Sequence, residues 1–262
     1  MAKIIAITNQ KGGVGKTTTA AAFISGLHHR GKKVLGIDLD PQGSLGFSLG
    51  IEIENCSTIY EVLKGQVPID EAIVSTEHGD LLPSNILLSA AELEFNRPGR
   101  EFLLKSQISR IELNYDYIII DTPPALNVLT LNAYVAADSL IIPMIPEILS
   151  LLGISQIQET IETVRRCYNS RLEVLGILLN KYSPRITLNQ EVLELSEQIA
   201  KQLNTRVFES KIRASVTVAS APAHGESVLT FAPRSKPALD FEQLIDSVVA
   251  EPFATEALKI SL

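Results

Sequence analysis

The sequence has few of the residues that build disulfide-linked or metal-clustered proteins. It contains no tryptophan, two methionines and two cysteines among 262 residues, and aromatic side chains make up 5% of it. Two cysteines, Cys56 and Cys167, are too few for a disulfide framework or a four-thiolate metal cluster, and their positions match no cluster spacing. This cysteine usage predicts a reducing, intracellular compartment.

Long apolar runs are also missing. None approaches the roughly 18 to 20 residues that a membrane-spanning helix needs. A first strand is expected from Lys3, which leaves no room for a signal peptide before it. We therefore expect a cytoplasmic protein with no membrane attachment. With 45% hydrophobic residues, the chain can bury one large core, and we expect a single domain over residues 1–262.

Positive charge is scarce overall and unevenly distributed. The net charge of −7 argues against a wholly basic nucleic-acid binder. Residues 1–180 carry 14 Lys/Arg and 20 Asp/Glu, residues 181–236 carry 8 and 5, and residues 237–262 carry 1 and 5. The differences are −6, +3 and −4. The basic segment is compatible with a polyanion site and equally with ordinary surface variation.

The most informative stretch lies near the start of the chain. Lys3–Thr8 predicts a strand and Thr18–Arg30 an alanine-rich helix, with KGGVGKTT, Lys11–Thr18, between them. In this context glycines let backbone N–H groups point at phosphate oxygens, and the helix N-terminus adds partial positive charge. The pattern places Lys16 on the β- and γ-phosphates of a nucleotide and the Thr17 hydroxyl on Mg²⁺.

The loop is a variant of the ordinary phosphate-binding pattern GxxxxGK[ST]. Gln10 stands where that pattern has its first glycine, and Lys11 adds a second lysine. The variant resembles the deviant Walker A ATPases, the ParA/MinD family. The resemblance implies ATP and Mg²⁺ as cofactors, and a homodimer in which Lys11 reaches the partner's nucleotide. The nucleotide-binding residues that it implies are Lys11, Gly12, Gly13, Val14, Gly15, Lys16, Thr17, Thr18 and Asn180.

Two later strands are expected to end in acidic residues. Lys33–Asp38 is followed by Asp40-Pro-Gln-Gly, and the apolar run from Tyr117 ends in Asp121 before Thr-Pro-Pro. Acids at the carboxyl ends of strands lie where open α/β sheets bind ligands. By resemblance, Asp40 positions or activates the attacking water, and Asp121 is the Walker B acid that holds Mg²⁺ together with Thr17. The catalytic residues implied are Lys11, Lys16 and Asp40.

The predicted strand Glu173–Leu179 ends in Asn180-Lys181. Asn180 resembles the family's adenine-edge reader, since its amide can donate and accept; a loop-capping asparagine is the competing interpretation. Ala221–Val228 resembles the family's late APxxGxxV segment, so the resemblance extends from residue 3 to about residue 245.

A second set of residues concerns DNA. Arg185 matches an arginine that ParA-type proteins use on the DNA backbone, whereas a second family arginine is replaced here by Thr217. Lys211 and Arg213 are close enough in sequence to substitute for it. We predict that Arg185, Lys211 and Arg213 form a non-specific DNA-binding patch that dimerisation doubles. Scattered, solvated bases are the alternative.

Strand and helix patterns alternate along the chain. This alternation predicts an α/β fold: a doubly wound, mostly parallel sheet flanked by helices, as in P-loop NTPases of the deviant Walker A type. Among the later elements we expect helices over Arg100–Leu113, Ile148–Tyr168 and Thr187–Leu203.

The resemblance implies a ParA-like ATPase that partitions a plasmid or chromosome or positions a protein cargo, is nucleoid-associated and works with a ParB-like partner protein. Three other classes of protein are alternatives to this one. A MinD-like positioning ATPase needs a basic amphipathic C-terminal helix, whereas residues 251–262 carry one base and two acids. A P-loop amide synthetase or iron–sulfur reductase needs a substrate pocket or paired cysteines. A tyrosine-kinase relative would show a C-terminal tyrosine cluster, and the last tyrosine is Tyr182.

Overall fold

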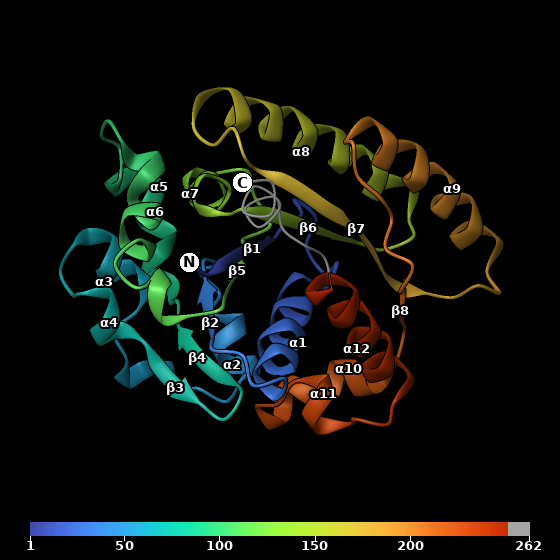
Figure 1. The fold of residues 1–262 in the computed structure, drawn as a ribbon, viewed down its shortest axis with the longest axis horizontal. Helices are drawn as coiled ribbons and strands as arrows, with labels where there is room; N and C mark the ends of the chain where they lie inside the picture. Colours follow the sequence, from blue (N-terminus) through green and yellow to red (C-terminus); the bar gives the residue numbers. More distant parts are fainter. Residues whose placement is uncertain (251–262) are drawn as a thin grey trace, which may run out of the picture.

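The computed structural model describes residues 1–250, and for residues 148–155 it describes the backbone alone. An eight-stranded sheet runs through the molecule in the order β3-β4-β2-β5-β1-β6-β7-β8, and only β3 is antiparallel to its neighbour (Figure 1). The strands are β1 (Lys3–Ile7), β2 (Val34–Asp38), β3 (Val74–Thr76), β4 (Gly79–Leu82), β5 (Tyr117–Asp121), β6 (Ser139–Met144), β7 (Glu173–Tyr182) and β8 (Ile212–Arg213).

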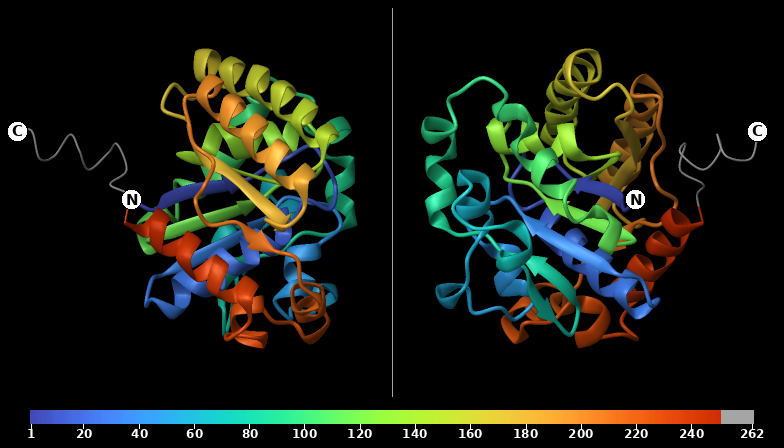
Figure 2. Two further views of the ribbon diagram at one scale, coloured as in Figure 1. Left: turned by 90° about the vertical axis from the view of Figure 1, so that its right-hand side faces the viewer. Right: turned by 60° about the vertical axis from the view of Figure 1, so that its left-hand side comes forward.

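Helices cover both faces of the sheet, with α8 and α9 side by side on one face and α1 with α12 on the other (Figures 1 and 2). The expected doubly wound, mostly parallel architecture is confirmed. The helices are α1 (Lys16–His29), α2 (Ser44–Ser48), α3 (Ile59–Lys64), α4 (Ile69–Ala72), α5 (Ala91–Glu94), α6 (Leu103–Ile108), α7 (Val128–Ala136), α8 (Ile148–Cys167), α9 (Thr187–Gln202), α10 (Val216–Ser220), α11 (Val228–Phe231) and α12 (Lys236–Val249).

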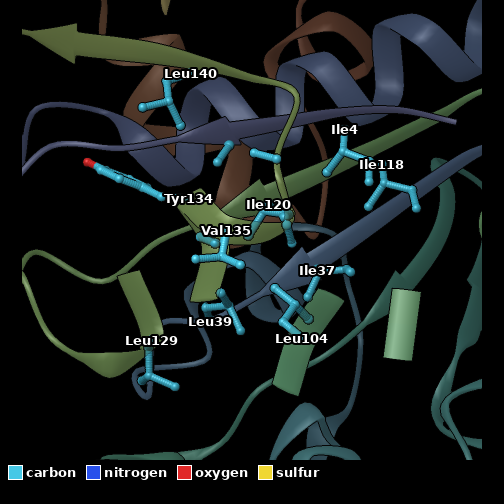
Figure 3. Packing of buried hydrophobic residues seen from close by; sticks show 14 of the residues in the cluster. Ile4, Ile37, Leu39, Leu104, Ile118, Ile120, Leu129, Tyr134, Val135 and Leu140 are labelled. Atoms are coloured by element: carbon cyan, nitrogen blue, oxygen red, sulfur yellow. The ribbon is translucent and has the colours of Figure 1, made fainter. Parts of the chain in front are cut away.

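The sequence of β5 is apolar at every position before its final aspartate because both faces of this strand are buried. Ile118 and Ile120 point into the core beneath α3 to α9, and Ile119 points into the core beneath α1 and α12. Successive side chains of a strand alternate between faces, so a strand covered on both sides needs a continuous apolar run. Figure 3 shows Ile118 and Ile120 packed with Ile37 of β2 and Ile4 of β1.

The strand register aligns the ends of the three central strands. Asp121 of β5 pairs with Ile7 of β1 on one side and with Asp38 of β2 on the other. The three segments that follow these residues, namely the glycine-rich loop, the Asp40 turn and the Thr-Pro-Pro segment, therefore leave the sheet at one edge. This carboxyl edge is where open α/β sheets bind ligands.

The prediction of one helix over Arg100–Leu113 is wrong. The segment forms the short helix α6 between two 3-10 turns, Arg100–Phe102 and Glu112–Asn114. The cause is Asn132 of α7, which accepts from the backbone N–H of Leu104 at 3.0 Å and donates to the carbonyl of Arg100 at 2.8 Å. A tertiary contact thus replaces the hydrogen bonds that a continuous helix would make here.

The expected helices from Ile148 and Thr187 are present as α8 and α9. No helix in the described part of the chain is long and apolar enough to cross a membrane. The charge argument against a membrane-binding C-terminal helix concerns residues 251–262, which lie outside the described residues.

Candidate functional site

The glycine-rich loop joins β1 to α1, as predicted. Gly15 directly precedes α1 and has a φ of 92°, in the left-handed region that favours glycine. A Cβ atom at Gly15 would lie 2.5 Å from Asn180 Nδ2. Both the backbone conformation and the close approach of Asn180 therefore require glycine at this position.

The loop forms one wall of a cleft of about 860 Å³ at the carboxyl edge of the sheet. The cleft brings together predicted residues from three distant parts of the chain, because Gly12–Thr18, Asp40 and Asn180 all line it. Lys181, Ile212, Arg213, Val216 and Phe241 extend the wall beyond the loop.

Lys16 and Thr17 turn toward Asp121. Lys16 is 7% exposed, and its Nζ donates to the carbonyl of Lys11 at 3.2 Å. Burial lowers the pKa of Lys16, and the nearby carboxylates of Asp121 and Asp40 partly oppose this shift. The Thr17 hydroxyl donates to Asp121 Oδ2 at 2.6 Å, so the two residues predicted to hold Mg²⁺ lie side by side.

The donors present fit Mg²⁺. Asp121 is fully buried, and its second oxygen, Oδ1, has no hydrogen-bond partner. Burial raises the pKa of Asp121. Among the described residues no cluster of three His, Cys, Asp or Glu side chains could hold a metal. Mg²⁺ commonly takes one or two protein oxygens and completes its shell with phosphate and water oxygens, so Thr17 and Asp121 suffice.

The two acids after β2 have different surroundings. Asp38 is fully buried and accepts from the backbone N–H groups of Asp40 at 2.9 Å and Leu45 at 3.0 Å. Burial, with the Asp121 carboxyl nearby, raises the pKa of Asp38 well above its usual range. Asp38 thus shapes the turn that presents Asp40 to the cleft. Sequence reasoning did not assign this role, since the motif does not show which acid is buried.

Asn180 contacts the loop directly. Its Nδ2 donates to the carbonyl of Val14 at 2.7 Å, while Oδ1 is buried without a partner. Strand β7 continues through Asn180 to Tyr182, so this asparagine sits within the strand rather than after it. The neighbouring Lys181, to which sequence reasoning gave no role, also lines the cleft.

Lys11 lies outside the cleft lining and forms an ion pair with Glu147 of the same subunit. Its backbone N–H donates to Asn9 Oδ1 at 2.9 Å, and Asn9 Nδ2 donates to the carbonyl of Pro143 at 2.7 Å. The start of the loop is therefore tied to the end of β6.

The three bases predicted to bind DNA have different environments. Arg185 is exposed in the turn before α9. Lys211 Nζ donates to the backbone carbonyl of Glu209 at 3.0 Å. Arg213 lines the nucleotide cleft and forms an ion pair with Asp240 of α12 at 2.5 Å. The DNA patch stays a prediction, with Arg185 its most accessible member.

This loop, with its two lysines, between β1 and α1 of a mostly parallel sheet defines a P-loop protein of the deviant Walker A type. Residues 2–174 match the family described as an AAA domain. The sporulation initiation inhibitor protein Soj of Bacillus subtilis is 40% identical over 95% of this chain and 99% of its own length. The chromosome partitioning protein ParA of Caulobacter vibrioides is 39% identical over 87% of each chain. The chain belongs to the ParA/Soj family of P-loop ATPases.

A solved structure is similar over nearly its whole length. A Mycobacterium smegmatis protein described as cobyrinic acid a,c-diamide synthase, with a bound ATP analogue and magnesium, has a TM-score of 0.83 and 36% identity. The similarity covers 95% of each chain.

Proposed function

We propose that this protein is a ParA-type ATPase: it binds ATP with Mg²⁺, closes into a homodimer around two nucleotides, and binds DNA non-specifically in that state. The observation that carries the proposal is the different placement of two lysines in one loop. Lys16 is buried beside Asp121 at the cleft, whereas Lys11 lies outside the cleft lining. This difference supports a role for Lys16 on its own subunit's nucleotide and for Lys11 on that of a partner.

The reaction would be transfer of the γ-phosphoryl group to water, with ADP as the leaving group. Its transition state spreads negative charge over phosphate oxygens, so catalysis rests on positioning and on cations. Lys16 supplies one cation in cis and Lys11 one in trans. Asp40, at the cleft, orients the water and accepts its proton. Mg²⁺, held by Thr17 and Asp121, would neutralise charge on the phosphates.

Asn180 supports adenine as the base. Its Nδ2 is committed to the Val14 carbonyl, which leaves Oδ1 as an acceptor without a donor. Adenine carries an amino group that can donate to such an oxygen. Guanine carries a carbonyl at the same ring position and would leave Oδ1 unpaired, at a cost of about 1–3 kcal/mol.

Exposed apolar side chains around the cleft support dimerisation through this edge. Val216 is 79% exposed and lines the cleft, and Phe47, at 62%, lies between the cleft-lining Ser44 and Ser48. Burial of these side chains against a second subunit would add to the stability of a dimer. Because Lys11 acts in trans, hydrolysis would be tied to dimerisation and the nucleotide would act as a timer.

The biological role that this chemistry supports is partition of a plasmid or chromosome, or positioning of a protein cargo, on nucleoid DNA. A ParB-like partner would accelerate a slow intrinsic hydrolysis. The name of the Caulobacter vibrioides relative, chromosome partitioning protein ParA, supports the partition role.

The decisive test is binding of random-sequence duplex DNA at two salt concentrations, with ATP or ADP and Mg²⁺. The ATP form should bind more tightly and with a steeper salt dependence, because a dimer neutralises twice as many phosphates as a monomer. Equal binding by the ATP and ADP forms would contradict the DNA part of the proposal and favour a protein scaffold as cargo.

A second candidate is a P-loop amide synthetase, which the similarity to the M. smegmatis structure favours. Such an enzyme would hydrolyse ATP in step with amide formation from a carboxylate and an ammonia donor. Assaying ATP hydrolysis with cobyrinic acid and glutamine, and separately with DNA, distinguishes the two. Amide product formed stoichiometrically with ADP would establish the synthetase.

A further inference from the structure

Lys181 has an unusual backbone conformation at the edge of the cleft. Its φ is 55°, and Asn204 is the only other non-glycine residue with positive φ among the described residues. This left-handed conformation costs a residue with a Cβ atom roughly 1–2 kcal/mol. Asparagine enters it more readily than most residues, whereas a long side chain such as lysine gains nothing from it locally.

The conformation results from an irregularity in the pairing of β7 with β8. Asn180 pairs with Ile212, and Tyr182 pairs with Arg213, so Lys181 is an extra residue on β7. Such a bulge re-aims the side chain of the inserted residue, and bulges occur often beside active sites.

The bulge lets two consecutive residues reach the same loop. In a regular strand their side chains would point to opposite faces of the sheet. Here Asn180 Nδ2 donates to the carbonyl of Val14 at 2.7 Å, and Lys181 Nζ donates to the carbonyl of Gly13 at 3.4 Å. The aliphatic stem of Lys181 therefore runs from the end of β7 toward the phosphate-binding loop.

Lys181 lines the part of the cleft that the proposed function leaves for the base of the nucleotide. With the phosphates at Gly12–Thr18 and the γ-phosphate facing Asp40, the stretch lined by Lys181 and Ile212–Val216 is left for the nucleoside. Arg213, on the neighbouring strand β8, has its guanidinium held by Asp240, with Nε donating to Oδ2 at 2.8 Å.

We propose that Lys181 is a positioning residue for the purine base, with its methylene stem covering one face of the ring. The inference rests on the proposed nucleotide-binding function. Anchoring of Nζ on the Gly13 carbonyl holds the stem extended, so apolar contact with the ring costs little side-chain entropy. Apolar contact with a ring face does not read a base edge, so Lys181 strengthens binding of any purine nucleotide equally.

The competing role for a cleft lysine is a phosphate contact. The two roles differ in their response to inorganic tripolyphosphate, which has the phosphates of ATP but no base. Contact between the stem and the base contributes to ATP binding and is absent from tripolyphosphate binding, so its loss weakens ATP binding more. A phosphate ligand, or a side chain that only stabilises the loop, contributes to both.

The test is Lys181→Gly, because glycine adopts a φ of 55° without strain and removes the whole side chain. Asn204→Gly is the matched control, since it makes the same backbone change outside the cleft lining. Calorimetric affinities for ATP, ADP, ITP and tripolyphosphate are measured for wild type and both variants, together with the melting temperature without ligand.

We expect Lys181→Gly to weaken the binding of ATP, ADP and ITP by the same factor of about ten. The lost burial of two methylene groups accounts for a factor of this size. Tripolyphosphate affinity should fall far less than ATP affinity, since only the contact of Nζ with the Gly13 carbonyl bears on it. The melting temperature should not fall, and Asn204→Gly should bind like wild type. Equal losses for ATP and tripolyphosphate, or no loss for ATP, overturn the assignment. A wild-type protein that binds no adenine nucleotide would refute the proposed function itself, and this inference with it.

Discussion

Lys11 Nζ lies 2.5 Å from a carboxylate oxygen of Glu147 in the same subunit, across 136 positions of sequence. Their side chains are 30% and 55% exposed, so the ion pair is largely solvated and contributes at most about 1 kcal/mol. A Lys11 that serves a partner's nucleotide must first leave Glu147. The ion pair therefore holds the lysine against its own subunit, and little free energy is needed to release it.

Glu147→Gln should promote the ATP-bound dimer, because neutralising the carboxylate removes the ion pair that holds Lys11 against its own subunit. Dimer formation is expected to strengthen about threefold, in keeping with a loss of less than 1 kcal/mol from the monomer. Light scattering with ATP over a concentration series measures this. Lys11→Ala is the control and should stay monomeric whichever residue stands at 147. Weaker dimerisation of Glu147→Gln would show that Glu147 assists the dimer instead.

Asp40→Ala should abolish turnover and spare binding. A group that handles the water is needed in the transition state more than in the ground state, so we expect a loss of at least about 100-fold in hydrolysis. ATP affinity should stay within about threefold of wild type on the same reasoning. Lys16→Ala, which removes the buried cation, should lose affinity as well. Comparable affinity losses in both variants would remove Asp40 from the role of water-positioning acid.

Arg185→Ala should weaken DNA binding by the ATP dimer and flatten the salt dependence. Removing one phosphate-binding side chain from each subunit lowers the slope by roughly 2 for the dimer. Arg213→Ala should have a smaller effect, since its guanidinium is engaged by Asp240. Titrations at several salt concentrations, with dimer mass checked by light scattering, measure both. The patch is ruled out if replacing Arg185, Lys211 and Arg213 together changes nothing.

His78 should make folding stability depend on pH. It is 1% exposed, its Nε2 donates to the carbonyl of Gly225 at 3.3 Å, and its Nδ1 has no partner. Burial lowers the pKa of His78, and Glu77 only partly opposes this shift. The unfolded chain therefore takes up the proton first as pH falls. The free energy of unfolding therefore decreases below roughly pH 6.5, by up to about 1.4 kcal/mol per pH unit.

His78→Gln provides the comparison, because its side-chain amide keeps a donor for the Gly225 carbonyl but does not titrate. Urea unfolding at pH 7.5, 6.5 and 5.5 should show a smaller loss of stability with acid in the variant. Parallel curves for variant and wild type would mean that other groups cause the acid sensitivity.

The sequence alone located the phosphate-binding loop, the strand that ends in Asp121 and the turn that carries Asp40. It did so because strand, glycine turn and helix are local patterns, and a strand buried on both faces must be apolar throughout. Parallel pairing then determined that these ends meet at one edge. The family, too, could be read from Lys11, Gly12–Lys16 and their spacing.

Contacts between distant residues were decided only by the tertiary structure. Asn132 breaks the predicted helix over Arg100–Leu113 by taking its backbone groups. Lys11 pairs with Glu147, and Arg213 with Asp240, across gaps that no local pattern spans. Lys181 is turned toward the loop by a bulge that exists only because β7 pairs with β8. Periodicity reports which face of an element is buried, whereas the partner that a side chain meets depends on how the whole chain packs.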